Sequence, residues 1–313
     1  MNDTRPAPLL SRQADAIGRQ DWPAATLYVV ATPIGNLADL GPRARHALQL
    51  ADVIAAEDTR TSRPLLDHWE ISTPLMAAHQ HNEAQAAEAI VERLVAGQRV
   101  ALISDAGTPA VSDPGARIVA AVRAAGYRVM PLPGPSAVLA ALMASGMTSD
   151  ARPEFVFAGF APTKSQARQN WLRQWCQLPA PVVMFESPHR LAATLRDLAA
   201  VCGDTRKLTV ARELTKRFEE IATLTAGDAE AWLKARPQGA QGEFVLIVEA
   251  APTETADTDQ HDELLCGLLR HMGVRDAARL GAQATGASRH ALYERALALR
   301  DAAAPQNPDD GDE

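Results

Sequence analysis

One pattern occurs three times in the first half of the chain: a short apolar run, a loop of Gly, Pro and small polar residues, and a helix-like stretch. The three loops are TPIGN (32–36), SDAGTP (104–109) and PGPS (133–136). Short β-branched runs are typical of buried strands, so each loop is expected to follow the end of a strand. Strands that alternate with helices predict a parallel sheet with helices on both faces. Ligands of such sheets bind beyond the carboxyl ends of the strands, so we expect the three loops to converge on one ligand.

A second group of strand-like runs begins near Glu154 and comprises FVFAGF, PVVMFESPHR, KLTVARELT and GEFVLIVEA. Helix-like stretches lie between them, which predicts a second α/β domain. The expected organisation has six parts: a disordered tail (1–25), an N-terminal α/β domain with the three loops (26–137), a second α/β domain (138–250), a linker (251–261), a small helical segment (262–300) and an acidic tail (301–313).

Composition and charge exclude several classes of protein. The net charge of −7 does not favour a protein that coats nucleic acid non-specifically, although one domain can still carry a local basic face. The three cysteines, Cys176, Cys202 and Cys266, are far apart, which argues against a disulfide framework or a zinc site. No signal peptide and no membrane-length apolar run is recognisable. We therefore expect a soluble, cytoplasmic protein with no membrane partner.

The three loops stand where other α/β proteins carry nucleotide-binding motifs, since the chain has no GxGxxG after its first strand and no GxxxxGK[ST]. Gly35, Gly107 and Gly134 allow backbone conformations and close ligand approaches that side chains forbid. The neighbouring prolines stiffen the loops, which lowers the entropy lost on binding. A single such loop is as well explained by an ordinary tight turn, but three at strand ends favour a ligand site.

The motif AAEDTRTS places two carboxylates, Glu57 and Asp58, at the end of a buried strand. One of them can serve as a base or can orient a reacting hydroxyl. The structural alternative is a salt-bridge network with Arg60 and Arg63 that holds the loop.

The motif HQHNE contains His79 and His81, but no third ligand is apparent nearby, so we expect no metal. His81, Asn82 and Glu83 are expected to start the next helix and to contact substrate.

The second domain carries two polar motifs at strand ends, FESPHR (185–190) and ARELTK (211–216). These motifs and the residues beside them carry Arg190, Arg212, Lys216 and Arg217. With Lys164, Arg168 and Arg173 they form a locally basic stretch, interleaved with Trp171, Trp175 and Phe218. Basic residues with aromatic residues can follow a nucleic-acid backbone and stack on bases. The alternative is a solvated helix face above core aromatic residues, which the pattern alone slightly favours.

The helical segment 262–300 has short helices separated by Gly273 and Gly286, a pattern that suggests a helix-turn-helix with Ser288 as an N-cap. Such a unit can contact nucleic acid. A packing appendage is an equally good explanation of the pattern.

Eight segments, taken in order, resemble the ribosomal RNA small subunit methyltransferase I family of the tetrapyrrole methylase superfamily: LYVVATPIGNLADL, DVIAAEDTR, HNE, ALISDAGTPAVSDPG, PLPGPSA, FESPHR, ARELTK and GEFVLIVE. The resemblance runs from about Leu27 to Glu249, with a weaker helical match beyond. It implies two α/β domains with S-adenosylmethionine in a cleft between them, usually in a homodimer. It also implies 2′-O-methylation of a cytidine ribose in the decoding region of 16S rRNA, within the small ribosomal subunit.

The resemblance and the motifs together define three sets of site residues. The expected cofactor-binding residues are Pro33, Gly35, Asn36, Ser104, Asp105, Ala106, Gly107, Thr108, Pro133, Gly134, Pro135 and Ser136. The catalytic candidates are Glu57 or Asp58, with His81, Arg212 and Lys216 as alternatives or substrate orienters. The expected substrate contacts are Arg60, Asn82, Lys164, Arg168, Glu186, Ser187, Arg190 and Glu213.

Two other functions remain open from the sequence. One is a sister enzyme that methylates a small tetrapyrrole, although such a substrate requires neither a basic second domain nor a helical appendage. The other is a non-catalytic ribosome-binding module that has kept a cofactor-shaped cleft, which the intact small-residue loops oppose.

Overall fold

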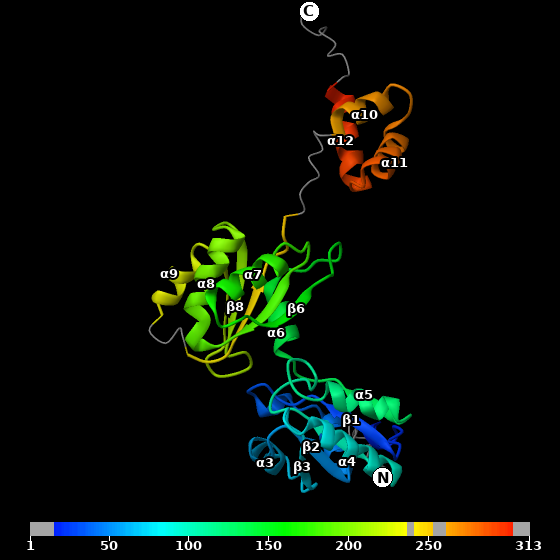
Figure 1. Ribbon diagram of the computed structural model, residues 1–313, viewed down its shortest axis with the longest axis vertical. Helices are drawn as coiled ribbons and strands as arrows, with labels where there is room; N and C mark the ends of the chain where they lie inside the picture. The colour runs from blue at the N-terminus through cyan, green and yellow to red at the C-terminus, as the bar shows by residue number, and fades with distance from the viewer. Residues whose placement is uncertain (1–15, 237–240, 253–260, 303–313) are drawn as a thin grey trace, which may run out of the picture. The chain divides into compact units, whose positions relative to one another are not determined.

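The computed structural model describes residues 16–236, 241–252 and 261–302. By its internal contacts the chain divides after Glu249 into two units, and each is described by itself. The first unit holds two five-stranded sheets, and the second holds three helices (Figure 1).

The first sheet is entirely parallel, in the order β3-β2-β4-β1-β5. Its strands are β1 (Thr26–Val30), β2 (Val53–Ala56), β3 (Leu75–Ala77), β4 (Val100–Ile103) and β5 (Arg128–Leu132). Its helices are α2 (Pro42–Leu50), α3 (Thr59–His68), α4 (Glu83–Val95) and α5 (Ala116–Ala124), with a 3-10 turn η1 (Leu37–Asp39).

Alternating strand residues supply the two cores of this domain. On one face Tyr28, Ile54 and Ile103 pack with Leu48 of α2 and Leu66 of α3. On the other face Leu27, Val53 and Leu102 belong to a core with residues of α4 and α5. Because both faces are covered, the strands are apolar on both sides, which is why the sequence shows continuous apolar runs rather than alternation.

The second sheet is mixed, in the order β6-β7-β10-β8-β9, and only its β6–β7 pair is parallel. Its strands are β6 (Val156–Phe160), β7 (Val182–Glu186), β8 (Lys207–Arg212), β9 (Glu220–Thr225) and β10 (Phe244–Val248). One face packs against α7 (Ser165–Trp175), α8 (Pro188–Cys202) and α9 (Ala229–Lys234). The opposite face packs against α6 (Ala137–Ser145), which directly follows the PGPS loop.

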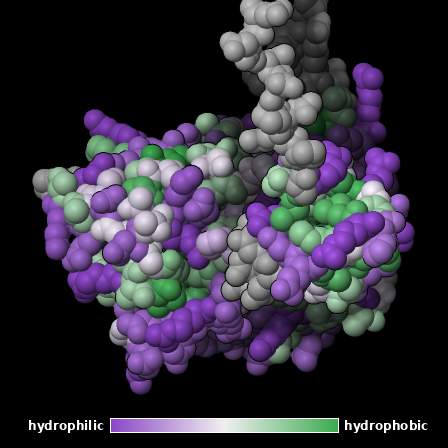
Figure 2. All heavy atoms as spheres, turned by 90° about the horizontal axis from the view of Figure 1, so that it is seen from above, coloured by the Kyte–Doolittle hydropathy of each residue, from purple (hydrophilic) through white to green (hydrophobic). Residues whose placement is uncertain are grey.

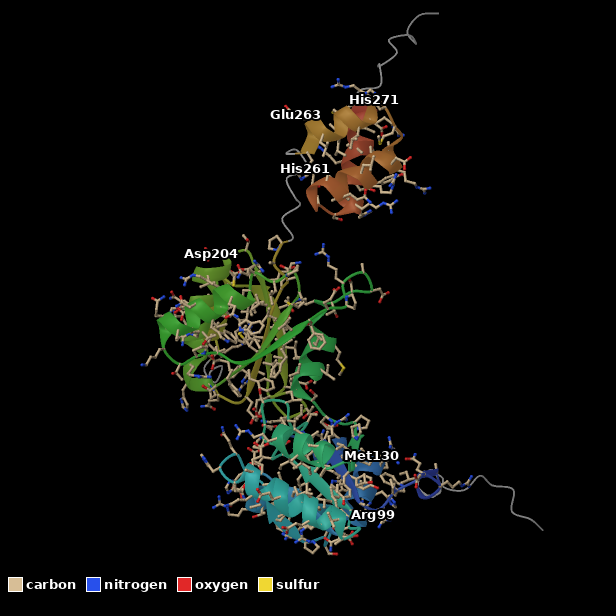
Figure 3. All side chains as sticks on the ribbon, turned by 45° about the vertical axis from the view of Figure 1, so that its right-hand side comes forward. Arg99, Met130, Asp204, His261, Glu263 and His271 are labelled. Carbon is tan, nitrogen blue, oxygen red and sulfur yellow. The ribbon has the colours of Figure 1, made fainter. Side chains whose placement is uncertain are left out.

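The expected disordered tail (1–25) is wrong for residues 16–25, which pack against the first domain. The Trp22 ring lies 4.9 Å from the His46 ring and 5.9 Å from the Tyr28 ring. Arg99, labelled in Figure 3, donates a hydrogen bond from Nε to the Trp22 carbonyl at 3.0 Å. The prediction failed because the segment is polar overall, and a single residue, Trp22, provides the apolar surface that packs against the domain. Residues 1–15 lie outside the described part.

The second unit contains α10 (Asp262–Leu269), α11 (Val274–Thr285) and α12 (Arg289–Ala302) around a core that includes Leu265 and Leu292. In Figure 3 His261 and His271 mark the two ends of α10. Gly286, at φ +73°, ends α11 and makes the turn into α12, as the helix-turn-helix pattern predicts. Most of the expected linker (253–260) and of the acidic tail (303–313) lies outside the described residues.

Hydrophilic side chains cover much of the face in Figure 2, with smaller hydrophobic groups among them. Large apolar side chains are nevertheless well exposed at Met143 of α6 and at Phe218, before β9. No helix in the described ranges has the length and apolar character needed to cross a bilayer.

Candidate functional site

The carboxyl ends of the parallel strands bring the three loops together, as the sequence predicts. Thr32, after β1, and Gly107, after β4, form an antiparallel bridge in which each N–H donates to the other's carbonyl, at 2.8 and 3.0 Å. Thr108 Oγ1 donates to the Pro135 carbonyl at 3.0 Å, which ties the β4 loop to the PGPS loop after β5. The three loops therefore form one hydrogen-bonded platform.

A cavity of about 360 Å³ lies between this platform and the ends of the second sheet. The platform contributes Ile34, the segments 106–108 and 111–113, and residues 136–138 at the start of α6. The second sheet contributes Phe160, the segment 185–188, Leu214 and the segment 243–245. The walls are mostly apolar, and the polar groups are few, as in sites for small ligands.

Asp113 is a carboxylate in the cavity wall. Its pKa is raised to about 6, mainly by burial and also by the nearby Glu57 and Asp105 carboxylates, while the Ser104 hydroxyl lowers it. It follows Ser112, whose φ of +65° is strained for a residue with a side chain. Asp113 was not among the residues predicted from the sequence.

The segment that carries Asp113 is anchored from the HNE motif. Glu83 is buried at the start of α4, and its Oε1 accepts from the Gly115 N–H at 2.9 Å and from the Arg117 N–H at 3.1 Å. A carboxylate at this position stabilises the N-terminus of α5 through its free N–H groups and its dipole. Glu83 therefore positions the SDPG turn, and its contact with substrate stays a prediction.

Glu57 and Asp58, the predicted catalytic carboxylates, lie beside the cavity and not in its wall. Glu57 Oε2 accepts from the Asp105 N–H at 3.3 Å, and Asp105 Oδ1 accepts from the Asp58 N–H at 3.0 Å. Burial raises the pKa of Glu57 and of Asp105. By contrast, Asp58 caps α3 and pairs with the exposed Arg60 at 2.8 Å, and the hydrogen bonds from Arg60 lower its pKa to about 2.

The ARELTK loop closes the cavity from the second sheet through Leu214. Glu213 at φ +50° and Thr215 at φ +66° are both in the left-handed region, which costs about 1–3 kcal/mol per residue. Lys216 holds the loop through ion pairs of 2.8 Å to Glu213 and to the cavity-lining Glu243. Burial opposes the charge on Lys216, but these two carboxylates outweigh it and raise the Lys216 pKa.

Lys216 also explains the glycine of the TPIGN loop. A Cβ on Gly35 would collide with Cγ of Lys216 and would lie 2.8 Å from its Cε, so the lysine stem crosses directly over this glycine. The close approach expected at Gly35 is thus made by the protein itself. Gly134 is similar, since a Cβ there would meet Ala31 at 3.1 Å.

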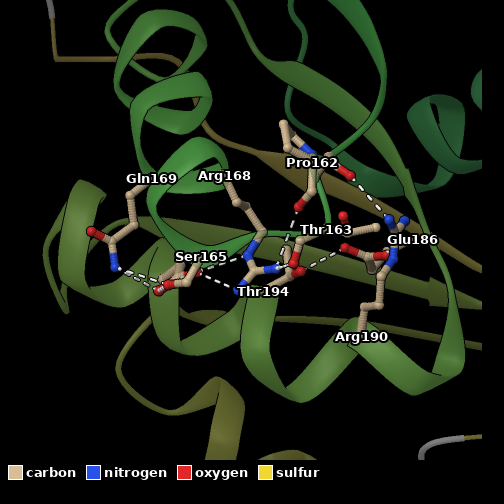
Figure 4. Close-up of polar contacts among 10 residues, drawn as sticks. Pro162, Thr163, Ser165, Arg168, Gln169, Glu186, Arg190 and Thr194 are labelled. Atoms are coloured by element: carbon tan, nitrogen blue, oxygen red, sulfur yellow. Dashed lines mark hydrogen bonds and ion pairs between the residues drawn. The ribbon is translucent and has the colours of Figure 1, made fainter.

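Glu186 and Arg190 of the FESPHR motif form a buried polar network (Figure 4). Glu186 lies in the cavity wall, accepts from the Ser187 N–H at 2.7 Å and pairs with Arg190 at 2.7 Å. Arg190 donates further to Ser187 Oγ and to the Ala161 carbonyl, which fixes the guanidinium behind the cavity. Glu186 and Ser187 therefore face the cavity, while Arg190 supports them.

The expected substrate contact at Arg168 is wrong. Its side chain is 4% exposed, and it pairs with Asp197 at 2.6 Å and donates to the Thr163 carbonyl at 3.0 Å (Figure 4). Arg168 joins α7 to α8 inside the second domain, and no macromolecule can reach it there.

The aromatic residues of the same stretch divide between core and surface. Trp171 and Trp175 pack against the core under α7 and α8, which is the structural alternative stated for this pattern. Phe218 is instead 61% exposed, with the Arg217 guanidinium 5.5 Å from its ring centre.

The remaining predicted residues divide by position. Those in the cavity wall are Ala106, Gly107, Thr108, Ser136, Glu186 and Ser187. Those beside it, in the same loops or paired with a wall residue, are Pro33, Gly35, Asn36, Ser104, Asp105, Pro133, Gly134, Pro135, Glu213 and Lys216. Those on neighbouring segments are Arg60, His81, Asn82, Lys164 and Arg212.

Two of these neighbouring residues have local roles. Asn82 accepts from the His79 N–H at 2.8 Å and donates to the Ala77 carbonyl at 3.1 Å, so it shapes the turn before α4. Arg212 donates from Nε to the Gln241 carbonyl at 2.7 Å and holds the chain before β10.

Sequence reasoning missed Asp113 and Glu243 in the cavity wall. Asp113 belongs to SDPG (112–115), which resembles an ordinary turn, and Glu243 immediately precedes an apolar strand. The available signal for Asp113 was a second Pro–Gly cluster only four residues after the SDAGTP loop. Nothing in the sequence marks Glu243, because its place depends on the pairing of β10 with β7 and β8.

Comparisons with known proteins agree with this architecture. The family Tetrapyrrole (Corrin/Porphyrin) Methylases matches residues 26–230, and the family described as RsmI C-terminal HTH domain matches residues 255–300. Ribosomal RNA small subunit methyltransferase I of Xylella fastidiosa is 46% identical over 86% of this chain and 97% of its own. The protein of the same name from Mesorhizobium japonicum is 46% identical over 91% and 97%.

Solved structures share the fold at low identity. A cobalt precorrin-4 methyltransferase covers 72% of this chain and 95% of its own with a TM-score of 0.53 and 16% identity. A uroporphyrin-III C-methyltransferase from Thermus thermophilus covers 72% and 94% with a TM-score of 0.52 and 18% identity. The predicted tetrapyrrole methylase fold is confirmed. Together with the two relatives, this shows that the chain belongs to the ribosomal RNA small subunit methyltransferase I family of tetrapyrrole methylases.

Proposed function

We propose that this protein transfers a methyl group to the 2′-hydroxyl of a cytidine in the decoding region of 16S rRNA, within the small ribosomal subunit. S-adenosylmethionine is the methyl donor, as the resemblance implied. The observation that carries the proposal is the cavity where the three loops meet the second sheet, in a chain whose relatives are named as rRNA methyltransferases.

The cavity fits such a donor in size and chemistry. Its volume of about 360 Å³ lies in the range of small-ligand sites. Apolar walls at Ile34, Val138 and Val245 suit an aromatic base, and the carboxylates of Glu186 and Glu243 suit groups of positive charge. The strained loops at Ser112 and Leu214 are held by the hydrogen bonds described above, so the site is formed before binding.

When bound, the sulfonium donor supplies an electrophilic methyl carbon. The protein's contribution is to align the acceptor oxygen with that carbon and to manage one proton. The platform of Thr32, Gly107 and Thr108 fixes the floor of the cavity. Leu214, held by the Lys216 ion pairs, closes the side nearest the second sheet.

A contact for the RNA is offered by Arg217 and Phe218, directly after Lys216. The loop is rigid, because the Thr215 N–H donates to Glu219 Oε2 at 2.6 Å. An exposed aromatic ring with a guanidinium beside it suits a base splayed out of its stack, with the cation near the phosphate. We propose that this pair, called the Arg217–Phe218 platform, stacks on a base next to the methylated nucleotide.

We expect Phe218→Ala to raise the KM for small subunits about tenfold with little change in kcat, since one stacked base contributes about 1–3 kcal/mol. Steady-state kinetics at saturating methyl donor measure both constants. Phe155→Ala is the matched control, because Phe155 is also exposed, at 38%, but precedes β6 at the end away from the cavity. Equal KM values for Phe218→Ala and Phe155→Ala would contradict a role of the Arg217–Phe218 platform in RNA binding.

The function is tested by incubating the protein with labelled S-adenosylmethionine and small subunits that lack the modification, and then mapping the label. Label on one cytidine ribose of 16S rRNA is expected. Label on a corrin or porphyrin precursor would point to the sister activity instead. Tight ribosome binding without transfer would point to a binding module.

We also propose that the protein is a cytoplasmic homodimer. Leu139 and Met143 lie one turn apart on α6 and are 53% and 85% exposed, an apolar pair that a second copy could cover. Sedimentation equilibrium is expected to give twice the mass of the chain. A monomer at micromolar concentration would contradict this assembly.

A further inference from the structure

Three carboxylates lie in the cavity wall: Asp113, Glu186 and Glu243. Glu186 is neutralised by Arg190 at 2.7 Å, and Glu243 by Lys216 at 2.8 Å. Asp113 has no ion-pair partner among the described residues, and the nearby Ser104 hydroxyl lies within hydrogen-bond distance of the Ala106 and Gly107 carbonyls, at 3.4 and 3.5 Å. A carboxylate without a cation keeps its affinity for a proton, whereas an ion-paired one loses it.

The charged groups that act on Asp113 within the described residues are both carboxylates. Glu57, from the end of β2, and Asp105, from the β4 loop, both act on it as like charges. Both of those carboxylates are occupied, because Glu57 accepts from the Asp105 N–H and Asp105 accepts from the Asp58 N–H. Burial and these neighbours give Asp113 a pKa of about 6, near neutral pH, where a general base is most effective.

The other predicted bases are less suited to the same task. Asp58 has a pKa of about 2 because Arg60 binds it, so it is a weak base, and it lies outside the cavity wall. Hydrogen bonds from Lys216 and the Glu243 N–H likewise lower the pKa of Glu213, against the effect of its burial. His81 is an exposed residue on the turn before α4 and is not in the wall.

The turn that carries Asp113 is also held in place. Glu83 fixes the Gly115 and Arg117 N–H groups, and a Cβ on Gly115 would meet Leu102 at 3.1 Å, so the turn sits tightly against the sheet. With the backbone of the turn fixed, only the side-chain torsions of Asp113 remain to be ordered when it accepts a hydrogen bond from substrate.

We propose that Asp113 accepts the proton of the acceptor hydroxyl during methyl transfer, an inference that rests on the proposed function. The hydroxyl oxygen forms a bond to the methyl carbon, and the carbon–sulfur bond breaks with its electron pair going to sulfur. The hydroxyl proton passes to a carboxylate oxygen of Asp113 and then to solvent. Charge balances, because the positive sulfonium becomes a neutral thioether as the proton is released.

The test compares wild type with Asp113→Asn, which keeps the size of the side chain and removes its basicity. We expect the single-turnover rate on small subunits to fall about 100-fold or more, in line with general-base contributions of about 10²–10⁴. Calorimetric affinity for S-adenosylmethionine alone is expected to change less than about threefold, because the group takes a proton and does not hold the donor. Asp67→Asn, an exposed carboxylate on α3, is the control for the removal of one negative charge.

The pH dependence gives an independent readout. The ionised carboxylate is the active form, so the wild-type rate should rise with pH through about 6 and then level off. Asp113→Asn should lose this acid limb as well as the rate. Rescue of the limb by Asp113→Glu would add support, since the longer carboxylate retains a titrating group.

Three other results would contradict either the role of Asp113 or the proposed function. A variant with more than half the wild-type rate, or with the acid limb intact, would overturn the assignment. Loss of donor affinity in Asp113→Asn would make Asp113 a ligand of the methyl donor instead of a base, and would also overturn it. If wild type itself transfers no methyl group to the subunit, the proposed function fails, and that result is visible before any variant is compared.

Discussion

Replacement of Gly107 by Val is expected to weaken binding of S-adenosylmethionine at least about 100-fold while leaving the protein folded. Gly107 is at φ +82°, where a β-branched residue is strained, and a Cβ would lie 3.2 Å from Cγ2 of Ile34. The strain and the collision both act on the residue whose bridge to Thr32 joins the β1 and β4 loops, so we expect this bridge to be displaced. A 100-fold loss of affinity corresponds to about 2.8 kcal/mol.

Gly126→Val is the matched control for this experiment. Gly126 has the same φ of +82°, but nothing lies within 4 Å of the position where its Cβ would be. The control therefore carries the backbone strain without the collision in the cavity wall. Calorimetry measures the donor affinity of both variants, and circular dichroism measures their folding. Wild-type affinity in Gly107→Val would mean that the donor binds elsewhere.

Arg168→Met is expected to lower the free energy of unfolding by about 3–5 kcal/mol, the usual cost of removing one partner from a buried ion pair. The substitution leaves Asp197 with an 11% exposed side chain and no cation, although Gln169 and Ser165 still donate to it. Urea unfolding at pH 7 measures the loss. Arg173→Met on the same helix is the control, because the Arg173 side chain donates to the exposed Asn170 and holds no buried carboxylate.

The ion pair between Arg168 and Asp197 also makes the free energy of unfolding depend on pH. Burial alone would raise the pKa of Asp197, but the hydrogen bonds from Gln169, Arg168 and Ser165 outweigh it and lower the pKa. A group with a lowered folded-state pKa stabilises the protein above its ordinary pKa of about 4, and that stability is lost as the pH falls further. The variant Arg168→Met should therefore lose less stability than wild type between about pH 4 and pH 2. Parallel acid-unfolding curves for the two proteins would contradict the ion-pair explanation.

The sequence predicts most of the fold because the fold depends on local periodicity. The apolar runs, the Gly and Pro loops and the helix ends at Gly97 and Gly126 mark the elements of the first domain within a few residues. Strand β3 escaped prediction because three residues are too few for a pattern. The antiparallel pairing in the second sheet also escaped, since hydrogen bonding between β10 and its neighbours is a long-range property.

The site was predicted less completely, and for a different reason. Motif composition identifies loops that face a ligand, but it does not show which polar side chains are already paired. Arg168 resembled an exposed cation because Lys164 and Arg173 surround it in the sequence, while its partner Asp197 lies on another helix. Conversely, Asp113 resembled a turn residue, and its distinguishing property is that no cation within the described ranges pairs with it, which only the folded structure reveals.

The crossing of Lys216 over Gly35 limits how these two positions can evolve. One residue belongs to the first domain and the other to the second, yet the lysine Cγ lies where a Cβ on the glycine would need to be. A side chain at position 35 is compatible only with a shorter or differently directed residue at position 216. We expect the two positions to vary together among descendants of a common ancestor, and a chimera that joins domains from distant relatives to fail at this pair first.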